Sequence, residues 1–183
     1  DNFYKSTDDN KAYTFVFVSP VIESDTSWGS PFAFDGFTFK ASQNFVANGA
    51  NTMLTISELQ NVKFRNCSFV GNGKVAGIQF NGCDNISFEN CSFVDFGGKV
   101  ISSNNTGDNS TITFSGENYF ANNVSENDSI LSFVKADVYF NVKPDKTDFE
   151  IPSNTIFEEN IANNVIDISS GSITAKNINF ANN

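Results

Sequence analysis

Hydrophobic and polar residues alternate along most of this chain in short runs that restart at a fixed interval. The run Val62-x-Phe64-x-Asn66-Cys67-x-Phe69 recurs as Ile86-x-Phe88-x-Asn90-Cys91-x-Phe93, with each marked position about 24 residues further on. The final stretch, Ile173-x-Ala175-x-Asn177-Ile178-x-Phe180, fits the same template. A period between about 20 and 50 residues is typical of repeat architectures, so the pattern predicts a solenoid.

Within each repeat the alternation of apolar residues is the periodicity of β-strands. The phase breaks at Asn66 and Asn90, and Asn adopts the left-handed conformation of a corner more readily than most residues. Two strands at such a corner, with a third around Ile78-x-Phe80 or Val100-Ile101, make a coil of about three strands. We expect an all-β, right-handed parallel β-helix of roughly seven coils.

Residues 31–183 should form the coils, and residues 1–30, which do not follow the template, should form an N-terminal cap over the open edge. One stretch interrupts the coils. The copy that begins at Val138-x-Phe140 reaches Phe157 only after a Pro-containing segment, 141–153, which we interpret as a projecting loop. Exposed insertions of this kind commonly form contact surfaces, so we predict that 141–153 is dispensable for folding. The candidate contact residues are Lys143, Pro144, Asp145 and Lys146.

Stacked coils place equivalent residues in columns about 4.8 Å apart. The repeats predict four columns of like residues: Phe64 under Phe88, Phe69 under Phe93, Cys67 under Cys91 and Asn66 under Asn90. Cys67 and Cys91 occupy the inward position that Ile178 takes in the last repeat, so we expect them to be small buried hydrophobic residues. A disulfide between neighbouring coils is possible by distance but awkward in orientation. Cys83 lies between Gly82 and Asp84 at a predicted turn, and is the candidate for an intermolecular disulfide.

The charge of the chain excludes some partners. Its 21 acidic and 11 basic residues give a formal charge of −10, which would repel nucleic acid and anionic lipid. There is no apolar run of about 18 residues and no signal-peptide pattern at the start. We therefore expect no nucleic acid and no membrane contact by this segment, with any secretion signal or anchor outside it.

No catalytic residue is predicted, although many parallel β-helices cleave acidic polysaccharides. Asp84, Glu89 and Asp95 lie within one coil and could supply the paired carboxylates of a glycosidase. The chain has no His, however, and its single Arg is Arg65, so groups that would bind or ionise an anionic sugar are scarce. A polysaccharide-binding or polysaccharide-cleaving β-helix stays the alternative reading.

No cofactor or metal is predicted either. Asp8-Asp9-Asn10 and the stretch from Asn104 to Asp108 are rich in the oxygen ligands that calcium prefers. Neither has the spacing of an EF-hand or of a Gly-Asp nonapeptide repeat. We interpret both as solvated loops.

A second motif, Phe-x-x-Asn, lies on the repeat. Its five copies are Phe45/Asn48, Phe69/Asn72, Phe120/Asn123, Phe157/Asn160 and Phe180/Asn183. The coil at Phe93 lacks it, with Phe96 where Asn is expected. We expect each motif Phe to fill the interior and each motif Asn to turn a corner, so that the motif is mainly structural.

Serial Phe-x-x-Asn copies on β-helical coils, with Ile112-Thr-Phe-Ser-Gly116, resemble the chlamydial polymorphic outer-membrane proteins. Passengers of that family also carry Gly-Gly-Ala-(Ile/Leu/Val), and the nearest match here is Gly97-Gly98-Lys99-Val100. The resemblance covers residues 37–183. It implies an autotransporter passenger at the bacterial cell surface, or secreted after processing, that binds a host-cell surface protein or sister passengers without catalysis. A passive β-helical stalk is a further alternative.

Overall fold

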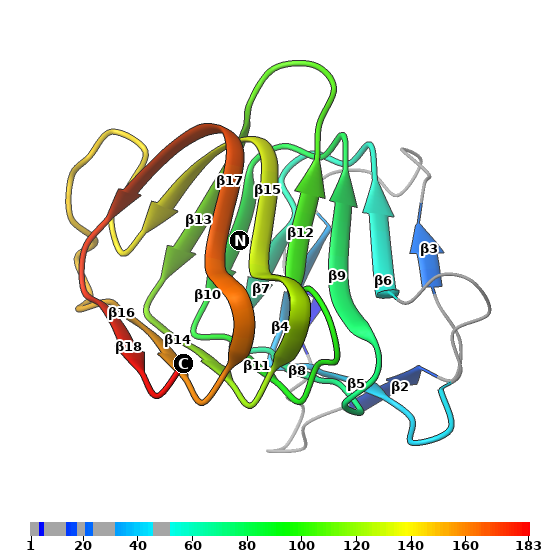
Figure 1. The fold of residues 1–183 in the computed structure, drawn as a ribbon. Coiled ribbons are helices and arrows are strands. Elements are labelled where there is room, and N and C mark those ends of the chain that lie inside the picture. Colours follow the sequence, from blue (N-terminus) through cyan, green and yellow to red (C-terminus); the bar gives the residue numbers. More distant parts are fainter. Residues whose placement is uncertain (1–3, 6–13, 18–20, 24–31, 46–51) are drawn as a thin grey trace.

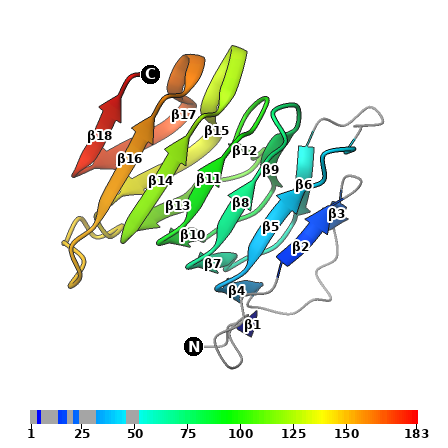
Figure 2. The same cartoon turned by 90° about the horizontal axis from the view of Figure 1, so that it is seen from below.

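The computed structural model describes residues 4–5, 14–17, 21–23, 32–45 and 52–183 of the chain. All regular structure in these ranges is β-strand, and the strands pair in parallel between successive coils (Figures 1 and 2). The predicted all-β parallel solenoid is therefore confirmed. Parallel pairing is possible because each coil brings the chain back to the same face one strand spacing further along.

Three walls of strands surround the core, and each coil adds one strand to each wall. The first wall contains β1 (Tyr4–Lys5), β4 (Ala33–Asp35), β7 (Lys63–Arg65), β10 (Ile86–Glu89) and β13 (Ser110–Ser115). The second contains β2 (Thr14–Phe17), β5 (Thr38–Ala41), β8 (Ser68–Val70), β11 (Ser92–Val94), β14 (Glu117–Ala121), β16 (Asn154–Glu158) and β18 (Ile178–Ala181). The third contains β3 (Val21–Glu23), β6 (Thr52–Ser57), β9 (Ala76–Asn81) and β12 (Ile101–Asn104).

Two long strands join the third wall to the first. β15 (Val124–Phe140) pairs with β12 through residues 131–134 and with β13 through residues 136–140, and β17 (Ile161–Ala175) pairs with β15 along most of its length. Lys135, with a φ of 53°, marks the bend within β15. The first and third walls are thus one 11-stranded sheet, and the second wall is a separate 7-stranded sheet.

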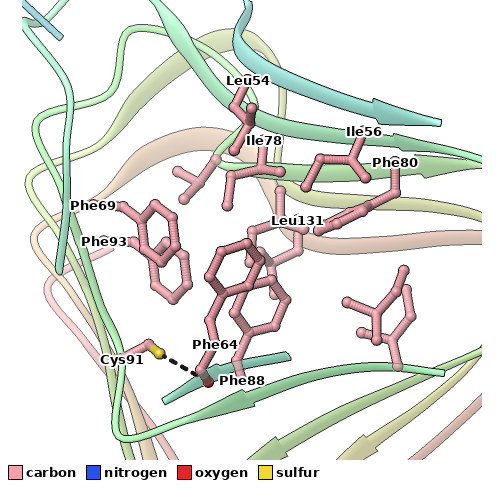
Figure 3. Packing of buried hydrophobic residues seen from close by; sticks show 14 of the residues in the cluster. Leu54, Ile56, Phe64, Phe69, Ile78, Phe80, Phe88, Cys91, Phe93 and Leu131 are labelled. Carbon is pink, nitrogen blue, oxygen red and sulfur yellow. Dashed lines mark hydrogen bonds between the residues drawn. The ribbon is translucent and has the colours of Figure 1, made fainter. Parts of the chain in front are cut away.

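Two columns of phenylalanine rings fill the interior, as the repeat predicted. In the first wall Phe64 pairs with Phe88, and their ring centroids are 5.5 Å apart (Figure 3). In the second wall Phe69 pairs with Phe93 at 4.9 Å, with the rings nearly parallel. The two columns meet edge to face, the geometry that the charge distribution of aromatic rings favours. A third column, from Leu54 to Leu131, is aliphatic and closes the core (Figure 3).

The predicted corners are also present. Asn66, Asn90 and Asn177 have φ values of 52°, 54° and 49°. The side-chain amide of Asn90 donates to Oδ1 of Asn66 at 3.2 Å, so the predicted asparagine column is a hydrogen-bonded ladder. Glycine takes the corner at Gly116, where φ is 67° and a side chain would collide with Asn90.

The N-terminal region continues the walls where it is described. β1, β2 and β3 lie within residues 1–30, and each pairs in parallel with a strand of the following coil. The other residues of the predicted cap lie outside the described ranges, so the cap stays a prediction. About six turns are described, and the estimate of roughly seven coils is not confirmed.

Candidate functional site

The asparagines of the Phe-x-x-Asn motif form a second ladder inside the stack. The side-chain amide of Asn123 donates to the backbone carbonyl of Phe93 at 3.1 Å and to Oδ1 of Asn160 at 2.9 Å. Asn160 in turn donates to the carbonyl of Phe120 and to Asn183. Each of these amides therefore joins its own coil to the next, and Asn123 and Asn160 are buried. Their side chains are not available to a partner.

The remaining motif residues are structural where they are described. Phe45, Phe69, Phe120 and Phe157 are buried, Phe180 is half exposed on the outermost described coil, and Asn48 lies outside the described residues. Asn72 donates to the carbonyl of Ser42 at 2.9 Å and accepts from the amides of Lys74 and Val75.

The motif asparagines do not themselves turn the corner, contrary to expectation. The left-handed conformation lies one residue earlier in three copies, at Asn122, Glu159 and Asn182, and at Asp95 in the coil without the motif. The backbone turns there, which leaves the next side chain pointing inward. Phe96 takes this inward position, and its amide donates to Oδ1 of Asn123 at 3.0 Å.

The segment nearest to the second family motif also supports the coil. A side chain on Gly97 would lie 2.4 Å from the carbonyl oxygen of Gly73, so only glycine fits. A Cβ on Gly98 would lie 3.3 Å from that of Ala76. Val100 is fully buried, and Lys99 pairs with Asp128 at 3.1 Å. The two glycines allow adjacent coils to approach closely.

All three cysteines are free and buried. Cys67 and Cys91 face the interior as predicted, and burial raises the pKa of Cys91 well above its usual range. Cys83 is only 1% exposed, so its proposed role in an intermolecular disulfide is wrong. The turn directs its thiol inward, where Sγ lies 3.4 Å from the carbonyl of Ile56 and burial raises its pKa.

The three carboxylates of one coil do not converge. Asp84 precedes β10, Glu89 ends β10 and Asp95 follows β11, so each lies at a different corner of the coil. Oδ1 of Asp84 accepts the backbone amides of Asn85 and Thr111 at 2.7 and 2.9 Å, which ties that group to its corner. Because paired carboxylates act only when both face one cleft, this trio does not form a hydrolytic pair.

The segment 141–153 connects β15 to β16 and projects from the corner between the first and second walls (Figure 1, yellow). Its ends belong to the stack. The side-chain amide of Asn141 donates to the carbonyls of Lys176 and Asn177 at 2.7 and 3.0 Å, and Val142 is buried. Oγ of Ser153 accepts from the backbone amide of Gly116 at 2.9 Å. Only the part between these anchors projects.

The projecting part is a compact hairpin. Val142 bridges Asp148 in antiparallel fashion, and the amide of Lys143 donates to the carbonyl of Thr147 at 2.9 Å. Hydrogen bonds from the hydroxyl and the amide of Thr147 lower the pKa of Asp145. Of the predicted contact residues, Pro144, Asp145 and Lys146 are exposed and Lys143 is half-buried.

A pocket of about 260 Å³ lies between this hairpin and the corner formed by β10 and β13. Glu89 and Glu150 supply carboxylates to it, Lys143 supplies an ammonium group, and Phe149 and Ile151 supply apolar surface. Ile151 is 71% exposed. Sequence reasoning found Lys143 but not Phe149 or Ile151. The available signal was two large apolar residues beside a proline in a loop with no core to receive them.

The described residues contain no group of three or more His, Cys, Asp and Glu side chains that could hold a metal ion. The Asp8-Asp9-Asn10 stretch lies outside the described ranges. No helix in the described part of the chain is long and apolar enough to cross a membrane.

The fold and the site define a parallel β-solenoid that presents a compact hairpin and an adjoining mixed-charge pocket. No protein-family model matches this chain, and no curated protein or solved structure matches it significantly.

Proposed function

We propose that this chain is an adhesive segment displayed on the outside of a bacterial cell, and that it binds a host-cell surface protein through the hairpin of residues 143–152. The observation that supports this most directly is the contrast between the hairpin and the motif residues. The side chains of Asn123 and Asn160 are buried and hydrogen-bond between coils, whereas Ile151 and the tip of the hairpin are exposed. Large apolar side chains displayed beside charged ones are typical of protein-binding surfaces.

The pocket supports the same proposal. Hot spots in protein interfaces occur where a partner side chain fills a pocket that excludes water. Phe149 and Ile151 provide apolar walls here, and Glu89, Glu150 and Lys143 provide charges that select orientation. The repetitive Phe-x-x-Asn pattern, and its resemblance to a family of surface passengers, supports display outside the cell.

Adhesion of coated beads to cultured epithelial cells tests the proposal. Beads coated with the chain should bind, and beads coated with a variant in which a short Gly-Ser linker replaces residues 143–151 should lose most of that binding. Lys146→Ala and Lys40→Ala are a matched pair, because both lysines are exposed but only Lys146 is in the hairpin. Equal binding by the linker variant would overturn the assignment, and no binding by the unmodified chain would favour a passive stalk.

A second candidate function is the binding or cleavage of a polysaccharide. The observation that favours it is the same pocket, since two carboxylates and a phenyl ring are groups that recognise sugars. A glycan panel with analysis of released sugars tests it. Release that is lost in Glu89→Gln and in Glu150→Gln would make this candidate the better one, whereas no retained glycan and no released sugar would eliminate it.

A further inference from the structure

A second loop projects from the solenoid between β12 and β13, at the corner between the third and first walls (Figure 1, green loop above β12). It spans residues 105–109, and the same corner of the next coil is turned within β15 at Lys135. A pocket of about 200 Å³ lies against this loop. The pocket is independent of the hairpin site and of the function proposed for it.

Two buried oxygen atoms beside this pocket have no hydrogen-bond partner. Asn105 is 6% exposed and its Oδ1 is unpaired, and Ser110 is 1% exposed and its Oγ is unpaired. Both residues line the pocket. Buried polar atoms in proteins are almost always paired, because an unpaired one retains the cost of losing its water. Four buried side-chain oxygens of the described residues lack a partner, those of Ser103, Asn105, Ser110 and Ser125, and the two that share this pocket are candidates to bind a ligand.

Two hydrogen bonds place the corner at Asp84 beside these two residues. Nδ2 of Asn105 donates to the carbonyl of Cys83 at 3.4 Å, so the Asn105 side chain contacts the residue that precedes Asp84. Oδ1 of Asp84 accepts from the amide of Thr111, the residue that follows Ser110. A second carboxylate, that of Asp108, lines the same pocket. Cys83 also lines the pocket, but its Sγ already donates to the carbonyl of Ile56 at 3.4 Å on the interior side.

The ammonium group of Lys135 contacts this loop, but Lys135 does not line the pocket. Its Nζ donates to the carbonyls of Thr106 and Gly107 at 2.8 and 3.1 Å, which secures the loop against the next coil. The pocket therefore contains two carboxylates and neutral oxygen donors, with no cationic side chain among its lining residues.

We propose that this pocket binds a calcium ion, held by Asp84, Asn105, Asp108 and Ser110. Calcium takes six to eight oxygen ligands at about 2.3–2.6 Å, from carboxylate, amide and carbonyl groups and from water. Two carboxylates match the double charge. The lack of imidazole or thiolate ligands disfavours zinc and copper.

Magnesium fits this site less well, because it requires a near-regular octahedron of ligands at about 2.0–2.1 Å and gives up its water reluctantly. Few protein ligands and only two carboxylates predict weak binding. We expect a dissociation constant on the order of 10⁻⁴–10⁻³ M, the range of extracellular calcium modules. The sequence spacing matched no calcium motif because the ligands come from two coils, Asp84 in one turn and residues 105–110 in the next.

Thermal unfolding and isothermal titration calorimetry of the whole chain test the proposal. After treatment with a chelator, calcium chloride at up to about 10 mM, with ionic strength held constant, should raise the Tm more than magnesium chloride does. Asp84→Asn and Asp108→Asn should each weaken calcium binding by about tenfold or more. Asp145→Asn, which removes a carboxylate from the other loop, should bind calcium as the unmodified chain does.

The two variants keep the test independent of folding. Asp108 lies in the exposed part of the loop, so Asp108→Asn should fold even if the change at Asp84 disturbs its corner. A calcium-specific Tm increase that disappears in Asp108→Asn supports the site. An equal response to magnesium, no response, or an increase that survives in Asp108→Asn would overturn it, and the unpaired oxygens would then be satisfied by water.

Discussion

Phe120 and Phe180 belong to the same column of rings and begin copies of the same motif, yet Phe120 is fully buried and Phe180 is 54% exposed. The ring of Phe120 is stacked between those of Phe93 and Phe157 at 4.6 and 4.7 Å, whereas among the described residues the ring of Phe180 stacks only on Phe157. A repeat residue therefore makes its full contribution to stability only when coils cover it on both sides, as expected of a one-dimensional stack.

Removal of the buried ring should have the largest effect. Phe120→Ala should lower the free energy of unfolding by about 3–5 kcal/mol, since it leaves a cavity between two stacked rings. Phe180→Ala should cost about 1 kcal/mol, because much of that side chain is already in water. Urea unfolding followed by circular dichroism measures both. Similar losses in the two variants would mean that the outermost described coil is covered in solution.

The asparagine ladder should give the next largest effect. Asn123→Ala should cost about 2–3 kcal/mol, because the amide of Phe96 and the carbonyl of Phe93 lose their partner in the interior. Asn179→Ala is the control, since its amide also bonds to a neighbouring coil, at Asn154, but on the exposed face. That change should cost less than about 0.5 kcal/mol. A decrease in the free energy of unfolding below about 1 kcal/mol for Asn123→Ala would contradict this structural role and would make Asn123 a candidate binding residue.

Most of the fold was predictable because repeats of equal length determine the register between neighbouring coils. Val62-x-Phe64-x-Asn66 and Ile86-x-Phe88-x-Asn90 differ by one period, and parallel stacking of equal periods leaves little choice of column. The corner at Asn66 followed from the preference of Asn for the left-handed region.

Other features were not predictable, because neighbouring coils impose them. Glu159 and Lys135 have positive φ values that neither residue favours. The amide of Glu159 donates to the carbonyl of Ala181 in the next coil, and Lys135 lies at a register shift in the pairing of β15 with β17. The direction of the Cys83 side chain was equally unpredictable, since the same turn could have placed its thiol on the outside. Both pockets combine residues from different coils, so no single stretch of sequence contains either site.

Gly116 lies at a corner of the stack and Gly107 in the projecting loop of residues 105–109, so they should respond differently to substitution. Gly116→Ala should cost about 1–2 kcal/mol, because φ is 67° and the new Cβ would lie 2.1 Å from Oδ1 of Asn90. Gly107→Ala should change stability little, since nothing lies within 4 Å of its Cβ position. Thermal unfolding of the two variants checks this, and an equal loss at Gly107 would indicate that the loop is packed more tightly than its surroundings imply.

The hairpin should contribute least to stability. Replacing residues 143–151 by a short Gly-Ser linker should change the free energy of unfolding by no more than about 0.5 kcal/mol. Most side chains of the hairpin are exposed to solvent, and the ion pair between Asp148 and Lys176 is exposed as well. Asn141→Ala should cost about 1–3 kcal/mol, since two carbonyls of the next coil lose a buried donor. Urea unfolding separates the two. A linker variant as unstable as Asn141→Ala would place the hairpin within the fold, and any loss of adhesion in that variant would then report on folding instead of contact.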